Sequence, residues 1–413
     1  MLTTQRLSRL DTSPPNSTRS IAGPLLMLAA ALIFAVLDGL IKWQGTKMKY
    51  LISVFLCSIL TVASANSEDQ HPAATNQFPD LITRVRISGP LDFCGEAVEL
   101  ESQDVRERLE KELLLTLWDR PQIALWIKRS GRYMPIIEKM LKEHDMPQDL
   151  KYVAIIESAL RPHAGSRKGA IGFWQFMEAT GLKYKLAINS EKDQRRNIFY
   201  STQAAIDYFK ELYDLLGSWT LSAAAYNMGE QGLQSEILAQ KTDNYYHLYL
   251  PLETQRYVFR IISAKMILSE PDTYGFRFAQ EDLYPPLQFD RIKLHCFQET
   301  PISLIAQAAD TSFKAIKDLN PEIRGHFLAA GSHPILIPTG TADGFQERFK
   351  ALVDQWEAEN KERVYVVKDG DNLSAIAERF NVPLPALLIW NRLKKNKHIH
   401  PGDRLVIYPE NTE

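Results

Sequence analysis

The stretch from Leu150 to Phe176 places a carboxylate where a helix should be apolar. In LKYVAIIESALRPHAGSRKGAIGFWQF, Val153 and Ala154 precede Glu157 by four and three positions, so a helix carries all three on one face. A carboxyl group on such a face loses water, which favours its protonated form. A raised pKa is what a general acid needs near neutral pH. The pattern therefore predicts either an acid catalyst at Glu157 or a buried carboxylate paired with an arginine.

The residues that follow Glu157 favour the catalytic alternative. Glycine, alanine and serine are frequent between positions 161 and 172, and small residues let a backbone approach a ligand closely. Later segments carry the aromatic faces and amide groups that commonly hold sugars: Phe173, Trp174, Gln175, Tyr226, Asn227 and Tyr257. Between Glu157 and Gln175 there is no other acidic residue. The expected chemistry is proton transfer by one carboxyl group beside a bound sugar.

The elements that must position these side chains are mainly helical. Between about 100 and 270, apolar residues recur at helical spacing, as in VRERLEKELLLTLW and TQAAIDYFKELYDLLG. Pro147 suits the first turn of the helix that carries Glu157. Pro162 should end that helix about one turn beyond the carboxylate.

Composition limits the classes of protein to which the chain can belong. Its 413 residues suffice for two or three domains, and 45% hydrophobic with 24% charged residues is typical of globular proteins. A net charge of −2 offers no basic excess for nucleic acid. No cysteine and histidine cluster has ligand spacing, so we expect neither a metal nor a cofactor. A disulfide between Cys94 and Cys296 stays open.

The first 65 residues differ from the rest. The run MKYLISVFLCSILTVASA, from Met48, has the layout of a secretory signal peptide with cleavage after Ala65. A second apolar run, over 21–37, either precedes the true start or spans a membrane. We favour Met48 as the true start. We expect an exported protein of the periplasm or cell envelope, and membrane association through this segment stays open.

The C-terminal third contains a repeat. Shifting Ile302–Pro338 by 71 positions places it on Leu373–Pro409 without a gap. The matched pairs include Asn320 with Asn391 and Gly331 with Gly402. Such self-similarity indicates duplicated structural units, and each unit reads strand, helix, helix, strand.

These patterns divide the chain into six parts. We expect an N-terminal segment over 1–65, a partly disordered leader over 66–98, a helical domain over 99–280 with its motifs in 146–270, a diverged repeat unit over 291–340, a helical linker over 341–363 and a second repeat unit over 364–410.

The second repeat unit resembles a LysM domain, in YVVKDGDNLSAIAERFNVPLPALLIWN followed by IHPGDRLVIYP. The first unit keeps Asn320, Gly331 and ILIP but lacks the Gly-Asp turn, so it resembles a diverged LysM unit. The resemblance implies binding of N-acetylglucosamine-containing glycans such as peptidoglycan or chitin. The residues that it assigns to glycan binding are Gly370, Asp371, Leu373 and Asn391. The alternative that either unit only packs on the rest of the chain stays open.

The motifs around Glu157 resemble the catalytic domain of soluble-lytic-transglycosylase-type enzymes. They occur in the family's order, as Glu157-Ser158, Gly172-Phe173-Trp174-Gln175, Ala225-Tyr226-Asn227 and Tyr257. The resemblance implies a mainly α, lysozyme-like catalytic domain followed by small α+β LysM units with the order βααβ. It also implies cleavage of the β-1,4 bond between N-acetylmuramic acid and N-acetylglucosamine in peptidoglycan.

The resemblance further implies a role for each residue. Glu157 would protonate the glycosidic oxygen and then deprotonate the muramic C6 hydroxyl, which closes a 1,6-anhydro ring without water. Ser166 would position Glu157 or the acetamido group, and Tyr257 would orient Glu157. The expected sugar contacts are Gln175 and Asn227 on the acetamido group, with Phe173, Trp174 and Tyr226 shaping the cleft.

Two other functions stay open. A goose-type lysozyme shares the implied fold but hydrolyses the bond, and it should place a second acid where it activates water. A non-catalytic wall-binding protein would use only the LysM units. The complete set Glu157, Gln175, Asn227 and Tyr257 argues against the latter.

Overall fold

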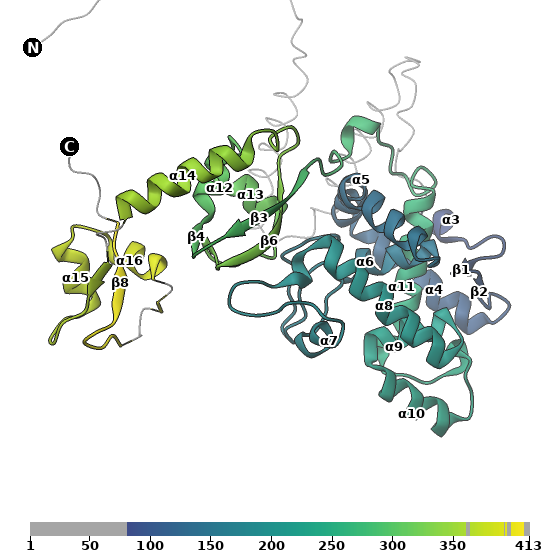
Figure 1. Cartoon of the computed structure of the whole chain (residues 1–413). Coiled ribbons are helices and arrows are strands. Elements are labelled where there is room, and N and C mark those ends of the chain that lie inside the picture. The colour runs from purple at the N-terminus through teal and green to yellow at the C-terminus, as the bar shows by residue number, and fades with distance from the viewer. Residues whose placement is uncertain (1–80, 361–363, 392, 395–397, 409–413) are drawn as a thin grey trace, which may run out of the picture. The chain divides into compact units, whose positions relative to one another are not determined.

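The computed structural model describes residues 81–408 except 361–363, 392 and 395–397 (Figure 1). All of them belong to one of the chain's two compact units, Asn76–Glu413. The expected signal peptide and residues 66–80 of the leader lie outside the described residues. Within the described part of the chain, no helix is long and apolar enough to cross a membrane.

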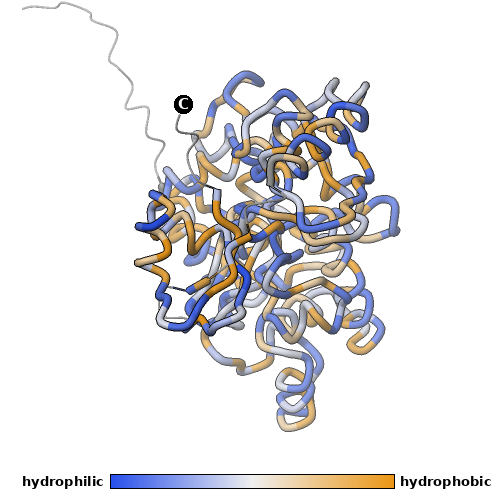
Figure 2. Tube along the Cα trace, turned by 60° about the vertical axis from the view of Figure 1, so that its left-hand side comes forward, coloured by the Kyte–Doolittle hydropathy of each residue, from blue (hydrophilic) through white to orange (hydrophobic). Residues whose placement is uncertain are grey.

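The first part of the described chain is a helical domain. Its helices are α3 (Leu81–Val85), α4 (Gln103–Trp118), α5 (Arg120–Glu143), α6 (Lys151–Ser158), α7 (Glu178–Lys183), α8 (Ile198–Leu216), α9 (Trp219–Met228), α10 (Glu230–Gln240) and α11 (Leu252–Ser269). A short hairpin of β1 (Asp92–Phe93) and β2 (Glu96–Ala97) precedes α4. Along the helices, hydrophobic and hydrophilic residues alternate in short runs, as expected of helices that bury one face (Figure 2).

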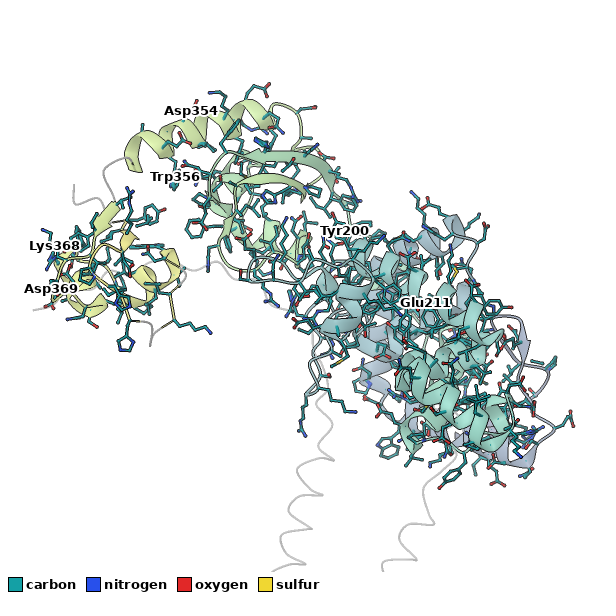
Figure 3. All side chains as sticks on the ribbon, turned by 60° about the horizontal axis from the view of Figure 1, so that its bottom comes forward. Tyr200, Glu211, Asp354, Trp356, Lys368 and Asp369 are labelled. Carbon is teal, nitrogen blue, oxygen red and sulfur yellow. The ribbon has the colours of Figure 1, made fainter. Side chains whose placement is uncertain are left out.

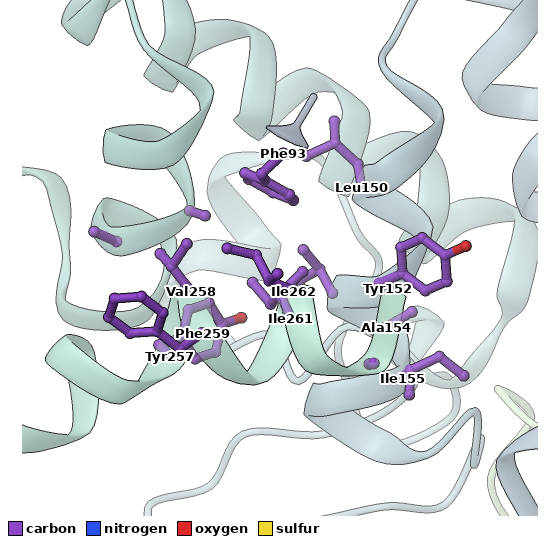
Figure 4. Packing of buried hydrophobic residues seen from close by; sticks show 14 of the residues in the cluster. Phe93, Leu150, Tyr152, Ala154, Ile155, Tyr257, Val258, Phe259, Ile261 and Ile262 are labelled. Carbon is purple, nitrogen blue, oxygen red and sulfur yellow. The ribbon is translucent and has the colours of Figure 1, made fainter. Parts of the chain in front are cut away.

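Helix α11 forms the centre of this domain and packs against α4, α6 and α9. Its residues Val258, Phe259, Ile261 and Ile262 are all 0% exposed, so α11 is apolar on most of its circumference. Figure 4 shows these side chains gathered with those of α6 and with Phe93 of the hairpin. Because α6 packs on this central helix, a side chain that faces α11 from α6 is held in a fixed environment.

Helix α6 is shorter than the sequence predicted. A 3₁₀ turn over Gln148–Leu150 leads into α6, which ends at Ser158, directly after Glu157. Ala159 and Leu160 then take left-handed backbone angles, with φ of 53° and 57°. This turn ends the helix before Pro162 is reached. Glu157 therefore lies in the last turn of α6.

Two small α+β units follow the helical domain. In the first, β3 (Asp290–Cys296) pairs antiparallel with β6 (Gly331–Ile337) and encloses α12 (Ile302–Ala308) and α13 (Phe313–Leu319). It also contains a small pair of strands, β4 (Thr300–Pro301) and β5 (Phe327–Leu328). In the second, β7 (Val364–Val366) pairs with β8 (Arg404–Val406) and encloses α15 (Leu373–Arg379) and α16 (Leu384–Trp390). The predicted fold class, a mainly α domain followed by βααβ units, is confirmed.

Helix α14 (Phe345–Asn360) lies between the two units. Phe345, Phe349 and Trp356 pack on the core of the first unit. Asp354 pairs with Lys350 on the exposed side. Figure 3 labels Asp354 and Trp356 on this helix.

One asparagine in each unit joins the second helix to the last strand. The amide nitrogen of Asn320 donates to the carbonyls of Ile316 and Leu336, and its oxygen accepts from the amide of Leu336. Asn391 makes the same three bonds, to Leu387 and Val406. Both residues therefore have a structural role that explains their recurrence.

These hydrogen bonds show that the gap-free alignment of the two repeat units is wrong in the last strand. Ile316 matches Leu387 at a shift of 71, but Leu336 matches Val406 at a shift of 70. The buried residues of the last strand agree, because Ile335 corresponds to Leu405. A slip of one residue would turn the buried face of a strand outward, so the repeat needs a one-residue gap before this strand.

The two cysteines of the described chain are not paired. Cys94 is partly buried in the β1–β2 turn and Cys296 is buried at the end of β3, and both are free. The disulfide that the sequence left open is therefore absent from the structure.

Candidate active site

Glu157 is partly buried and accepts a specific hydrogen bond. Burial raises the pKa of Glu157 from 4.5 to about 7, although the hydrogen bond from Tyr257 and the charge of Arg260 lower it. The charge of Glu253 adds a smaller upward effect. The partial negative charge at the C-terminus of α6 also disfavours a carboxylate in the last turn. Near neutral pH the group therefore populates both protonation states.

Tyr257 on α11 orients this carboxyl group. Its hydroxyl donates a hydrogen bond to Oε1 of Glu157. Tyr257 is 2% exposed, and burial together with the nearby Glu157 holds the pKa of Tyr257 well above its usual range. The tyrosine therefore keeps its proton and remains a donor. Because Oε1 accepts this bond, the proton of a neutral Glu157 carboxyl is left for Oε2.

The Gly-x-x-Gln motif lies in a compact loop, residues 164–176, which we call the motif loop. Short bridges pair Gly165 with Ile171 and Ile171 with Phe176. The amide of Gly172 donates to the carbonyl of Ala164 at 2.9 Å. The loop is thus folded by its own backbone rather than by a helix or an extended sheet.

Gln175 uses one end of its amide group to hold the motif loop. Its Nε2 donates to the carbonyl oxygens of Ala164 at 3.2 Å and Gly172 at 2.9 Å. These two bonds use both amide hydrogens. The Gln175 side chain is partly buried, and its carbonyl oxygen is the end left to accept a hydrogen bond from a ligand.

Ser158 fastens the motif loop to the helix that carries the acid. Its side chain is buried, and its hydroxyl donates to the carbonyl oxygen of Phe173 at 2.7 Å. Since Ser158 directly follows Glu157, this bond fixes the distance between the end of α6 and the motif loop.

Phe173 and Trp174 lie in the core. Each is 1% exposed. Phe173 meets the ring of Tyr133 edge-on, and the indole nitrogen of Trp174 donates to the hydroxyl of Thr202 at 3.0 Å. Neither ring presents a face to solvent, so in this structure both support the motif loop from behind.

Tyr226 and Asn227 end helix α9 near the acid. The ring of Tyr226 stacks on Phe209, with centroids 4.8 Å apart, and its hydroxyl donates to the carbonyl of Trp174 at 2.7 Å. Burial raises the pKa of Tyr226 well above its usual value, and the charge of Glu157 contributes to the same shift. The carbonyl oxygen of Asn227 accepts a hydrogen bond from Thr254 at 2.8 Å. The Thr254 bond thus leaves the amide nitrogen of Asn227 as the end that can donate to a ligand.

Ser166 lies in the exposed turn of the motif loop. Its hydroxyl accepts a hydrogen bond from the amide of Ala170 at 3.0 Å. Among the hydrogen bonds of the described residues, none joins Ser166 to Glu157. The structure thus joins Glu157 and Tyr257 by a hydrogen bond, and places Ser166 at the edge of the same loop as Gln175.

The four LysM residues form the frame of the second unit. Asp371 accepts hydrogen bonds from the hydroxyl of Tyr365 at 2.6 Å and the amide of Lys368 at 2.8 Å. Gly370 precedes it with a φ of 81°, a backbone angle that favours glycine. Leu373 packs against the core of this unit. The side-chain amide of Asn391 is bonded to backbone groups of Leu387 and Val406.

Three residues that lie near Glu157 or Asn227 were not identified from the sequence. Arg260 lies three positions after Tyr257 and so shares its helix face, and Glu253 lies four positions before it. Thr254 orients Asn227. Their spacing from Tyr257 is a usable signal once α11 is known to pack on α6. Within the described residues, no three His, Cys, Asp or Glu side chains gather as metal ligands do.

Comparison with known proteins supports both halves of this description. Residues 134–249 match the model of the transglycosylase SLT domain, and residues 365–407 match the model of the LysM domain. The membrane-bound lytic murein transglycosylase D of Escherichia coli strain K12 is 31% identical over 332 residues, which cover 76% of this chain and 72% of that protein.

Two further matches are more limited. A putative tributyltin chloride resistance protein of Alteromonas sp. strain M-1 is 32% identical over 108 residues, which cover 25% of this chain and 52% of that protein. The crystal structure of the soluble lytic transglycosylase SLT70 of Escherichia coli aligns with a TM-score of 0.32 at 18% identity, and the match covers 42% of this chain and 29% of that one.

Proposed function

Because this chain belongs to the membrane-bound lytic murein transglycosylase D family, and is therefore a lytic murein transglycosylase that acts on peptidoglycan, we propose that Glu157 serves as its general acid and then as its general base. The bond cleaved is the β-1,4 bond between N-acetylmuramic acid and N-acetylglucosamine. The product carries a 1,6-anhydro-muramic end.

The first step uses the neutral form of Glu157. Its Oε2 proton passes to the glycosidic oxygen as the bond from that oxygen to C1 breaks. The substrate's own acetamido group stabilises the positive charge that develops at C1. Tyr257, which donates to Oε1, keeps the carboxyl group in one orientation and stabilises the carboxylate that forms.

The second step returns the proton. The Glu157 carboxylate removes the proton from the muramic C6 hydroxyl, whose oxygen attacks C1 and closes the ring. The carboxyl group ends protonated as it began, and no water is consumed. A pKa of about 7 suits both steps, because it balances donation against acceptance near neutral pH.

Gln175 and Asn227 are suited to hold acetamido groups. Gln175 offers a carbonyl oxygen, which can accept from an acetamido N–H. Asn227 offers an amide N–H₂, which can donate to an acetamido carbonyl. Their remaining polar atoms are held by the protein, so neither amide can turn over without breaking a bond. Ser166 would add contacts from the edge of the motif loop.

The observation that carries this proposal is the hydrogen-bonded pair of Glu157, which is partly buried, and Tyr257, which is buried. A retaining or inverting glycosidase uses two carboxyl groups. Here one carboxyl group has the raised pKa and the fixed hydrogen bond, which fits a route in which one residue acts twice.

One observation favours a second candidate. The charge of Glu253 acts on Glu157, so a further carboxylate lies near the acid. If Glu253 activates a water, the enzyme hydrolyses the same bond as goose-type lysozymes do. Glu253 is exposed and makes no described hydrogen bond to Glu157, which favours the one-carboxylate route.

Further parts of the proposal concern delivery to the substrate. The LysM domain at 365–407 keeps the enzyme on glycan strands, with Gly370 and Asp371 forming one turn of its binding face. The segment that ends at Ala65 exports the chain to the periplasm or envelope.

Digestion of purified peptidoglycan, followed by mass spectrometry of the ends, tests the reaction: anhydro ends support ring closure, whereas ends heavier by one water support hydrolysis.

A further inference from the structure

The motif loop is held from behind by one buried arginine. Arg195 is 3% exposed, and its Nη1 donates to the carbonyl oxygens of Gly169 and Phe176, both at 3.2 Å. These two carbonyls lie on either side of Gln175's motif. Arg195 therefore bridges two points of the loop that are seven residues apart in sequence.

The backbone of Arg195 also touches the motif loop. Gly172 has a φ of 86°, and a Cβ built on it would lie 1.8 Å from the carbonyl oxygen of Arg195. The turn that carries Arg195 thus forms the surface against which Gly172 rests. A displacement of this turn would be passed directly to the loop that carries Gln175.

The direction of the Arg195 side chain is set by Asp193. Asp193 is 0% exposed and accepts from Nε of Arg195 at 2.8 Å and from Nη2 at 3.0 Å. Burial by itself would raise the pKa of Asp193, but the hydrogen bonds from Arg195 and Arg324 outweigh it and lower the pKa. The carboxylate is therefore charged, and it holds Arg195 by a two-point contact.

The first βααβ unit completes this arrangement. Nη2 of Arg324, in that unit, donates to Oδ2 of Asp193 at 2.9 Å. The two segments also form an isolated antiparallel β-bridge between Lys192 and Ile323. The backbone amide of Asp193 donates to the backbone carbonyl of Glu322 at 2.8 Å. The backbone amide of Arg324 donates to the backbone carbonyl of Glu191 at 2.7 Å.

A side-chain contact strengthens the same junction. Nζ of Lys192 lies 2.8 Å from Nδ1 of His333, a residue of β6. The first βααβ unit thus meets the helical domain through backbone hydrogen bonds, the ion pair of Arg324 with the buried Asp193, and this polar contact. Through Arg324, the first βααβ unit binds the Asp193 carboxylate, which in turn orients Arg195.

We propose that Asp193, Arg195 and Arg324, here called the Asp193 cluster, position the motif loop for catalysis. On this proposal the first βααβ unit contributes to the reaction by completing the cluster through Arg324. None of the three residues contacts substrate, and each acts through the loop that carries Gln175. The inference rests on the proposed role of Glu157 and Gln175.

The test uses the full chain and a soluble glycan fragment of two disaccharide repeats, which is too short for avidity from distant glycan-binding units to matter. In Arg324→Ala we expect kcat on this fragment to fall between about tenfold and about a hundredfold, because small misplacements at a reacting centre have effects of that size. KM should change less than kcat. Amide hydrogen exchange in residues 164–176 should become faster.

Two variants make the test specific. Arg324→Lys keeps the charge and should recover part of the lost kcat. Lys314→Ala, in α13 of the same unit, removes an exposed ion pair with Asp318 and should change neither kcat nor exchange. The Arg324 side chain is 40% exposed, so its replacement leaves the fold in place, which thermal unfolding verifies.

Unchanged kcat and unchanged exchange in Arg324→Ala would overturn the inference. A loss seen only on intact peptidoglycan, with the short fragment cleaved normally, would also overturn it and assign the unit to glycan gripping. The proposed function fails separately, if the parent chain releases hydrolysed ends or if Glu157→Gln retains activity. Exchange in the motif loop still tests the cluster in that case.

Discussion

The hydrogen bond from Tyr257 to Glu157 makes a prediction about pH. In the proposed mechanism the reaction begins with a neutral Glu157, so kcat/KM should fall as pH rises through its pKa of about 7. The Tyr257 hydrogen bond lowers this pKa because it stabilises the carboxylate. Tyr257→Phe removes the bond but keeps the ring in the core, so the pKa should rise and the descending limb should move to higher pH.

The size of the shift follows from the strength of the bond. A hydrogen bond to a charged group contributes about 1.5–3 kcal/mol, and part of it is regained from water once the hydroxyl is removed. One pKa unit corresponds to about 1.4 kcal/mol. We therefore expect the limb to move upward by about one unit.

The assay is the pH dependence of kcat/KM on a soluble glycan fragment, which reports the pKa of the free enzyme. Tyr152→Phe is the matched control, because this buried tyrosine of α6 bonds Ser269 rather than Glu157. Its limb should stay in place. A limb in Tyr257→Phe that stays at the parent position, or moves to lower pH, would refute the reasoning.

Three further predictions concern stability and the motif loop. Glu157→Gln should match the parent in stability at pH 4 and exceed it by about 3 kcal/mol at pH 8, since the folded-state pKa of about 7 lies above the unfolded value of 4.5 and the penalty grows as pH rises between them. Urea unfolding at both pH values measures this, and equal stability at pH 8 would count against a raised pKa for Glu157. Gly172→Ala should lower kcat by at least about a hundredfold because its Cβ would meet the Arg195 carbonyl at 1.8 Å, whereas Gly165→Ala, with no atom nearer than 3.9 Å, should be tolerated. Glu253→Gln should leave kcat within about threefold of the parent and lower the pKa of Glu157, because it removes a like charge; a loss as large as that of Glu157→Gln would favour hydrolysis with Glu253 as the base.

The position of Glu157 on a largely buried helix face could be predicted from sequence because local spacing determines it. Leu150, Val153 and Ala154 precede Glu157 at helical intervals, and the structure buries all three. The C-terminal end of α6 was predicted less accurately: the sequence placed it at Pro162, and the structure ends the helix at Ser158. Proline was the visible stop signal, but left-handed angles at Ala159 and Leu160 end the helix first, and neither residue type announces such angles.

The roles of the aromatic residues depended on tertiary packing. Phe173 and Trp174 look the same in sequence whether they face a sugar or the core. The structure buries them because Tyr133 and Thr202 approach from other helices. In the core these two rings anchor the motif loop, which carries Gln175.

Long-range contacts were the least predictable part. Asp193 and Arg324 are 131 residues apart, and no periodic pattern links them. The repeat was visible because Asn320 and Asn391 recur, yet its last strand is displaced by one residue. A gap of one residue between short strands leaves almost no trace in sequence, although it decides which side chains face the core.

The most direct test of the central claim is the chemical end that the enzyme leaves on peptidoglycan. The parent chain and Glu157→Gln are incubated with purified sacculi, and the released muropeptides are weighed by mass spectrometry. The account predicts 1,6-anhydro-muramic ends from the parent and no release from the variant. Reducing ends from the parent, or undiminished release by Glu157→Gln, would contradict it.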